Sequence, residues 1–134
     1  MILLLSGASE VARMAVAAKV LDEHSDWRHV ALEDLREEGE WDEEADPEEV
    51  FGAIVACNLA KEAEKEGCSV LITCPSDILF ATVREEFSKR LVTVHMAASQ
   101  DPPRRGPRFD HVLKTDQYSV KKTFEYLEAV ITKA

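Results

Sequence analysis

Apolar residues are concentrated in five short runs, separated by longer segments in which apolar and polar residues alternate at helical spacing. Each run has the length of a β-strand, and most are almost continuously apolar, which is typical of strands buried on both faces of a parallel sheet. The first and third runs are the most apolar, so we expect them inside the sheet and predict the spatial order 2-3-1-4-5. The runs lie at Met1–Leu5, Trp27–Leu32, Cys68–Cys74, Leu91–Met96 and Phe109–Thr115.

Four segments between and after the runs have the apolar spacing of helices, and cap signals mark several of their ends. Asp46, followed by Pro47 and Glu49, forms a capping box, and Gly67 ends that helix. The expected helices begin at Glu10, Asp46, Ser76 or Asp77, and Ser119. Their expected inward residues are Val11, Met14, Ala15, Ala18, Val20 and Leu21 in the first, Val50, Phe51, Ile54, Val55, Leu59 and Ala63 in the second, Leu79, Phe80, Val83 and Phe87 in the third, and Val120, Phe124, Leu127 and Val130 or Ile131 in the last.

The alternation of strands and helices predicts a three-layer α/β/α sandwich around a five-stranded parallel sheet, formed by a single domain over residues 1–134. In such folds ligands bind at the carboxyl ends of the strands, near the point where the strand order reverses. We therefore expect the segments that follow the strands to meet at one edge of the sheet. These segments are Gly7, Glu33 with Asp34, residues 75–77 and residues 97–99.

The composition is that of a globular protein: of 134 residues, 46% are apolar and 31% are charged. The formal net charge of −10 disfavours nonspecific binding to nucleic acid or to an anionic membrane. No apolar run is long enough to cross a membrane, and no basic leader precedes the first run, so we expect a cytoplasmic protein. Cys57, Cys68 and Cys74 have no CxxC spacing, which indicates reduced thiols and no metal site.

Acidic residues are concentrated between positions 33 and 49, where eleven Asp and Glu residues stand against one arginine. Such a segment is typical of a solvated loop and the start of a helix. A surface for a basic partner or a weak cation site is the alternative interpretation. In either case the segment would repel an anionic substrate that approached from its side.

The turn after the first run has the register of a phosphate-binding loop of pattern GxxxxGK[ST]. Gly7 stands at the first glycine, and Ala8 and Ser9 are the first two of four spacers. Ala12 and Arg13 then replace the second glycine and the lysine, and Met14 replaces the hydroxyl residue. The alternative interpretation is an ordinary turn between strand and helix, with Arg13 as a surface residue.

Each replacement weakens the chemistry of such a loop. The methyl group of Ala12 crowds the approach of phosphate to the backbone, and the Met14 thioether is a poor ligand for Mg²⁺. Arg13 keeps the positive charge of the lysine, but its guanidinium is a wide planar fork. Glu10 adds negative charge within the spacer. The loop is therefore predicted to be degenerate. We expect it to keep a weak anion site formed by Gly7, Ala8, Ser9, Ala12 and Arg13, because the long side chain of Arg13 can still reach an anion held by the N–H groups of residues 8–12.

Taken over its whole length, the chain resembles P-loop kinases of the adenylylsulfate and nucleoside-monophosphate kinase group. Four segments carry the likeness. Residues 2–21 have the register of the family's strand, loop and first helix, and residues 32–36 resemble its acidic substrate-side segment. Residues 70–76 resemble the strand that ends near the metal and the transferred phosphate, and residues 109–120 resemble the final strand and helix, where adenine is held. The resemblance implies a P-loop kinase-like fold. It also implies a nucleotide-base side that includes Lys114 and Thr115.

The family carries an arginine-bearing lid of roughly 25 to 40 residues between the fourth and fifth strands. Here that stretch is the short segment 99–108, in which Arg104, Arg105 and Arg108 are the candidate remnants of the lid. Phosphoryl transfer depends on positioning and electrostatics from the loop lysine, Mg²⁺ and lid arginines, and all three are weakened in this chain.

The leading hypothesis is a noncatalytic P-loop-kinase-like protein that binds a protein partner or self-associates, and that binds phosphate or nucleotide weakly. The alternative is an active small-molecule or nucleotide kinase that uses ATP, with Arg13 in place of the lysine and Asp34 or Asp77 holding Mg²⁺. A flavodoxin- or receiver-like protein is disfavoured, because Ser6 and Gly7 stand where a receiver has an acidic pair. Cys74, before a helix start, is either a reactive thiol or a buried inert one.

Overall fold

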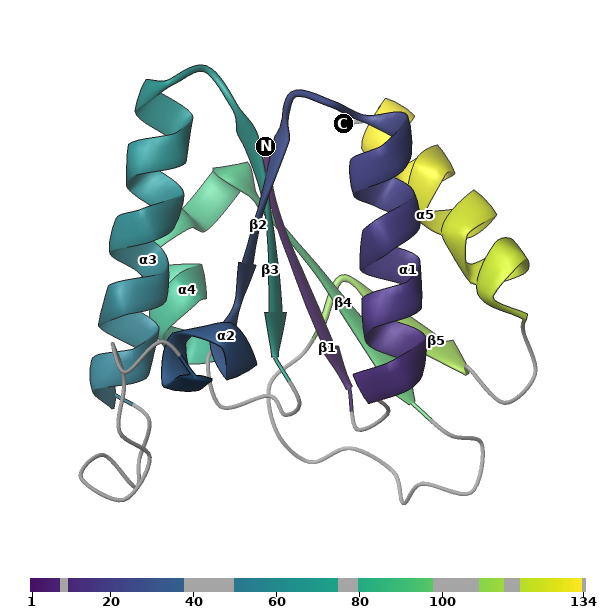
Figure 1. Ribbon diagram of the computed structural model, residues 1–134, viewed down its shortest axis with the longest axis horizontal. Coiled ribbons are helices and arrows are strands. Elements are labelled where there is room, and N and C mark those ends of the chain that lie inside the picture. Colours follow the sequence, from purple (N-terminus) through teal and green to yellow (C-terminus); the bar gives the residue numbers. More distant parts are fainter. Residues whose placement is uncertain (8–9, 38–49, 75–79, 98–108, 115–118, 134) are drawn as a thin grey trace.

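The five expected strands form one parallel sheet of order β2-β3-β1-β4-β5, as predicted (Figure 1). The computed structural model describes residues 1–7, 10–37, 50–74, 80–97, 109–114 and 119–133. In register, Ser6 of β1 lies between Cys74 of β3 and His95 of β4. The strands are β1 Ile2–Gly7, β2 Trp27–Ala31, β3 Ser69–Cys74, β4 Leu91–Ala97 and β5 His111–Lys114.

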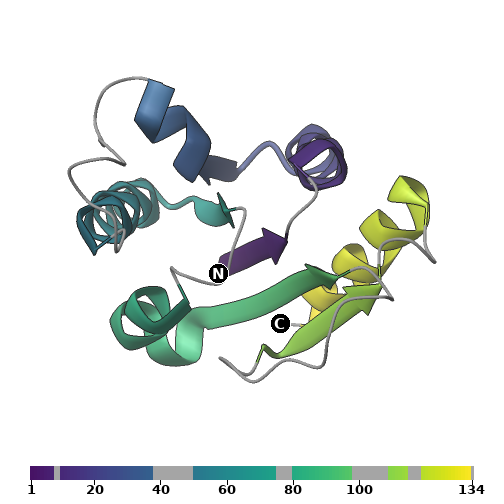
Figure 2. The same cartoon turned by 90° about the horizontal axis from the view of Figure 1, so that it is seen from below.

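Helices cover both faces of this sheet, which confirms the three-layer arrangement (Figure 2). On one face lie α1 and α5, and on the other α3 and α4, while α2 follows the end of β2 and packs with α3. The helices are α1 Glu10–Glu23, α2 Leu32–Glu37, α3 Val50–Lys65, α4 Phe80–Phe87 and α5 Val120–Lys133, with a 3-10 turn at Ser88–Arg90.

Strand β1 shows how the alternation of a β-strand divides the core into two layers. Ile2 and Leu4 pack into the layer below α3 and α4, whereas Leu3 and Leu5 pack into the layer below α1 and α5. All four side chains are fully buried. A strand with helices on both faces has no solvent-facing side, so β1 is apolar at every position from Ile2 to Leu5.

The inward face of α1 differs from the expected one. Its buried residues are Arg13, Val16, Ala17 and Val20, whereas Val11 is 85% exposed. Ala18 is also exposed, and Met14, Ala15 and Leu21 are only partly buried. Apolar residues occur on every side of this helix, so hydrophobicity alone does not define its inward face, and a core position is occupied by an arginine.

The face of α3 was also predicted incompletely. Small residues approach the sheet most closely, and Val55 and Leu59 pack beside them, but Ile54 is 46% exposed. The buried small residues are Ala53, Ala56, Cys57, Ala60 and Ala63. Of the residues expected to face inward from α4, Val83 and Phe87 are buried as predicted.

Two boundaries differ from the sequence-based ones. Leu32 and the acidic residues after it begin a short helix, α2, whose Leu32 and Leu35 are buried, so this part of the segment is not a solvated loop. Strand β1 also continues through Ser6 to Gly7, two residues past the predicted break, because both residues still pair with β4.

The cap of the last helix is confirmed: the hydroxyl oxygen of Ser119 accepts a hydrogen bond from the Lys122 backbone N–H at 3.1 Å. In α5, Leu127 is buried, and Val120, Phe124 and Ile131 pack against the same core layer. In the described ranges, no helix has the length and apolar character that crossing a membrane requires. The capping box at 46–49, the start of the third expected helix at 76–79 and the side chains at 50, 51 and 80 lie outside the described residues.

Candidate functional site

The carboxyl ends of the strands meet at one edge of the sheet, the lower edge in Figure 1. Gly7 ends β1 and Ala97 ends β4 at this edge, and α2, which carries Asp34, begins directly after β2. These three expected site residues therefore lie at the same end of the molecule. Residues 75–77, 98 and 99, also expected there, lie outside the described residues.

The junction between β1 and α1 is short. Strand β1 ends at Gly7 and α1 begins at Glu10, so only residues 8 and 9 connect them. Glu10, Ala12 and Arg13, which correspond to loop positions in the phosphate-binding pattern, are helical here. The negative charge of Glu10, which is exposed in the first turn, is favourable to the helix dipole but unfavourable to an anionic ligand.

Gly7 is required at this junction by its packing against β4. Its φ is +155°, and a Cβ at this position would lie 2.5 Å from the carbonyl oxygen and 2.9 Å from the Cβ of Met96. Both contacts are shorter than van der Waals distances allow. The close approach of β1 to β4 therefore accounts for this glycine without any ligand.

Arg13 lies inside the protein, with only 1% of its surface exposed. Its guanidinium turns back towards the end of β1 and donates a hydrogen bond from Nη1 to the Gly7 carbonyl oxygen. The alternative expectation that Arg13 is a surface residue is wrong. Its positive charge is engaged by the backbone at the strand end, and its stem occupies a core position between α1 and the sheet.

A buried Ser–His pair lies beside this junction, and sequence reasoning missed it. Ser6 Oγ is hydrogen-bonded to His95 Nδ1 at 2.9 Å, and the His95 ring lies against the Phe109 ring with centroids 5.0 Å apart. Ser6 and Cys74 have no exposed surface, and His95 is 9% exposed. Neither the hydroxyl nor the thiol is therefore placed to attack a substrate from solvent, and Cys74 is the buried thiol of the two alternatives.

The pair was missed because its members are 89 residues apart. The strand order contained the necessary signal, since β1 was predicted next to β4 and both residues stand near the ends of their strands. A polar residue near the end of each of two neighbouring parallel strands indicates a contact across the sheet.

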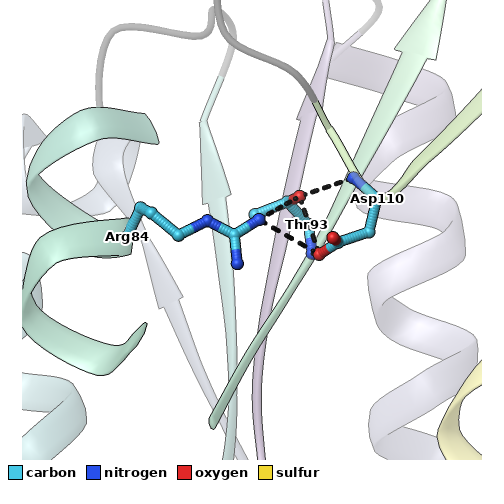
Figure 3. A network of polar contacts seen from close by, with 3 residues as sticks. All are labelled: Arg84, Thr93 and Asp110. Atoms are coloured by element: carbon cyan, nitrogen blue, oxygen red, sulfur yellow. Dashed lines mark hydrogen bonds and ion pairs between the residues drawn. The ribbon is translucent and has the colours of Figure 1, made fainter. Parts of the chain in front are cut away.

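A second polar network ties α4, β4 and the start of β5 together (Figure 3). The carboxylate of Asp110 accepts hydrogen bonds from the Thr93 backbone N–H at 2.9 Å and from the Thr93 hydroxyl at 3.1 Å. The Asp110 N–H donates to the Thr93 hydroxyl oxygen at 2.9 Å. Arg84 Nη2 lies 3.2 Å from both the Thr93 hydroxyl oxygen and an Asp110 carboxylate oxygen.

This network changes the acidity of Asp110. Partial burial alone would raise the pKa of Asp110, but the hydrogen bonds from Thr93 and the guanidinium of Arg84 outweigh it and lower the pKa below its ordinary value. Asp110 stands two residues after position 108 and directly before β5, so the network fixes the point where the chain returns to the sheet.

The remaining candidate residues are only partly described. Asp34 is exposed on α2, and Lys114 is exposed at the end of β5. Within the described ranges, no group of three or more His, Cys, Asp or Glu side chains is arranged to hold a metal ion. Ala8, Ser9, Asp77, Arg104, Arg105, Arg108 and Thr115 lie outside the described residues.

No family model matches the sequence, and comparison with curated proteins gave no match. Similar solved structures include APE1195, with a TM-score of 0.71 and 14% identity over 100% of this chain and 96% of that one. A cysteine-to-alanine mutant of the APS kinase CysC from Mycobacterium tuberculosis has a TM-score of 0.69 and 18% identity, covering 98% of this chain and 96% of that one. The hexameric APS kinase from Thiobacillus denitrificans has a TM-score of 0.61 and 16% identity over 96% of this chain and 28% of that one.

The class that these structures define is that of P-loop kinase-like α/β proteins, and this chain has their fold. The fold expected from the resemblance in sequence is thereby confirmed. At these levels of identity the likeness concerns the fold alone.

Proposed function

We propose that this chain is a noncatalytic protein of P-loop kinase-like fold, which binds phosphate or nucleotide weakly at the β1–α1 junction and acts through a partner. The observation that carries the proposal is the position of Arg13, which stands in register with the lysine of a phosphate-binding loop but is buried and bonded to the Gly7 carbonyl.

A cation that serves a phosphate must be able to reach it. To do so, the Arg13 guanidinium would have to leave a buried, charge-assisted hydrogen bond, worth about 1.5–3 kcal/mol. The Ala12 methyl group, the Met14 thioether and the exposed carboxylate of Glu10 further disfavour a metal-bound polyphosphate. The anion site that remains consists of the backbone around Gly7, Ala8, Ser9 and Ala12, and it performs no chemistry.

An active kinase with a non-standard loop is the competing function. It is favoured by the fold shared with two APS kinases and by Asp34, an exposed carboxylate at the carboxyl edge that a Mg²⁺ ion can approach. One of these neighbours is described as hexameric, which favours self-association as a second form of partner binding for this chain.

Isothermal titration with ATP and ADP, with and without Mg²⁺, separates the two functions. We expect a dissociation constant no tighter than about 100 μM, or roughly 5.5 kcal/mol, and no strengthening by Mg²⁺. Micromolar, Mg²⁺-dependent binding of ATP would instead support the kinase.

The triple variant Ala12→Gly, Arg13→Lys, Met14→Thr tests whether the junction is a decayed phosphate loop. With the motif restored, nucleotide binding should strengthen at least tenfold, or about 1.4 kcal/mol, without turnover, because the lid segment is still short. Circular dichroism before the titration checks that the variant is folded. If the folded variant binds no better than the parent chain, the junction is only a structural turn.

A further inference from the structure

A groove follows the outer edge of the sheet at β2. Because the strand order begins with β2, this strand pairs with β3 on one side and with no other strand in the described part of the chain. Residues 28–31 of β2 form one wall of a cavity of about 280 Å³, and residues of α2, of α3 and of the turn after α3 form the rest. No residue of the β1–α1 junction is among the described lining residues.

The lining of this groove is apolar in depth and acidic at its surface. Ala63 is buried and Leu59 is half-buried, whereas Glu62 on the same helix and Glu66, directly after the end of α3, are exposed. Leu59, Glu62 and Ala63 are spaced so that they share one side of α3, which faces β2, and Glu66 follows in the turn after the helix. A ligand in this groove therefore contacts apolar side chains at the floor of the groove and carboxylates at its rim.

The charge of the groove is negative. Arg28 lies 3.3 Å from Glu66, and this ion pair neutralises both side chains. Asp34 and Glu62 also line the groove and are exposed, and Arg28 is the only Arg or Lys among the described lining residues, which leaves two negative charges there. The opposite edge strand, β5, ends instead at the exposed Lys114.

We propose that this groove binds an extended, lysine- or arginine-rich segment of a partner protein, which adds to the sheet as a further strand beside β2. The inference rests on the partner-binding function proposed above and names the chemical class of that partner. A second copy of this chain fits less well, because its net charge of −10 would meet the acidic groove.

In this proposal, backbone pairing along β2 provides the binding affinity, and the charge of the groove determines which peptides bind. Backbone groups of an added strand pair with the edge of β2, and every second side chain of that strand points towards α3. A lysine at such a position lays its hydrocarbon stem over Leu59 and Ala63 and brings its ammonium group to Glu62. The basic end of β5 makes the same peptide unfavourable at the other edge.

The test uses the full chain and a fluorescein-labelled hexapeptide of alternating lysine and threonine, with binding followed by anisotropy at low ionic strength. Two control peptides keep the length: one has N-methylated amides along one backbone edge, and the other has glutamate in place of lysine. The variant is Glu62→Lys, and its matched control is Glu125→Lys, which makes the same charge change on an exposed site of α5.

We expect Glu62→Lys to weaken peptide binding at least tenfold, or about 1.4 kcal/mol, and Glu125→Lys to change it less than about twofold. Both control peptides should lose binding. Amide NMR signals of residues 28–31 should shift on addition of the parent peptide, because the added strand contacts them.

Equal binding of the N-methylated peptide would overturn the proposal, since attraction would then depend on charge and not on strand pairing. Equal weakening by the two variants, or no peptide binding, would also overturn it. A dimer in sedimentation that Glu62→Lys dissociates would assign the edge to a second copy and reject the basic partner. ATP titration of the same sample tests the proposed function separately from the groove. Weak ATP binding without peptide binding rejects only the groove proposal. Tight, Mg²⁺-dependent ATP binding rejects the noncatalytic function.

Discussion

Two arginines hold neighbouring parts of the sheet together in different ways. Arg13 is 1% exposed and donates to a backbone carbonyl at the end of β1. The Arg84 side chain is 34% exposed and joins Thr93 to the carboxylate of Asp110. The first is a cross-link inside the protein, and the second is an ion pair that water reaches.

The difference teaches that sequence position does not determine what an arginine does. Arg13 stands where a phosphate-binding loop has its lysine, yet its charge is turned into the protein, whereas Arg84 belongs to no motif and keeps a solvated charge. Removal of Arg13 should lower the free energy of unfolding strongly, because the buried Gly7 carbonyl is left without its hydrogen bond. Solvent screening reduces the contribution of the Arg84 ion pair to the free energy of unfolding.

Removing each arginine tests this contrast most strongly. Arg13→Ala should lower the free energy of unfolding by about 3 kcal/mol, since it removes buried packing as well as the bond to Gly7. Arg84→Ala should lower it by about 1 kcal/mol or less, because the ion pair is exposed. Urea denaturation measures both. Equal losses for the two variants would show that burial of Arg13 has no energetic consequence.

Two glycines provide a comparison for the packing at the β1–α1 junction. Gly7→Ala should lower the free energy of unfolding by about 2 kcal/mol, since the new methyl group meets the Met96 backbone at 2.5 Å. Gly67→Ala should cost about 1 kcal/mol, because φ is +84° but nothing lies within 4 Å of the new Cβ. Thermal denaturation of the two variants compares them. A smaller loss at Gly7 than at Gly67 would contradict the close approach of β1 to β4.

The network of Arg84, Thr93 and Asp110 should respond to pH, with a smaller effect than either pair above. The pKa of Asp110 is lowered in the folded state, so its stabilising contribution is present above the pKa of the unfolded carboxyl group, about 3.9, and is lost as pH falls through the folded value. We expect the stability difference between the parent and Asp110→Asn, at most about 1 kcal/mol at pH 7, to shrink below about pH 4.

The same acid titration provides a control for the interior arginine. The Gly7 carbonyl oxygen that accepts the bond from Arg13 does not titrate, so the contribution of this bond should keep its size over the same range. If the loss at Asp110→Asn did not change with pH, the carboxylate would contribute nothing through its charge.

The strand order could be predicted because burial on both faces leaves a direct trace in the sequence. Every position of Leu3–Leu5 is apolar, whereas β2 and β5 contain charged residues, and this contrast orders the sheet from centre to edge. The helix faces were less predictable. In α1, Arg13 occupies a core position, and in α3 small residues pack closest to the sheet while Ile54 is half-exposed.

The candidate site was predicted in outline and not in its contacts. Gly7, Asp34 and Ala97 reach the expected edge because parallel strands bring their carboxyl ends together. The direction in which the Arg13 side chain turns cannot be read from register, because a long, flexible side chain can face either the ligand or the protein. The Ser6–His95 bond required pairing polar residues across two strands, which apolar periodicity does not address.

The central claim is that the charge of Arg13 is held by the fold and is not available to a phosphate. The most direct measurement is arginine side-chain ¹⁵N NMR, with the Arg13 signal assigned from its loss in Arg13→Lys. We predict that this signal is protected from solvent exchange and does not move when ATP or inorganic phosphate is added up to about 100 μM, the affinity limit proposed above. A saturable shift of the Arg13 signal with a micromolar midpoint would contradict the account.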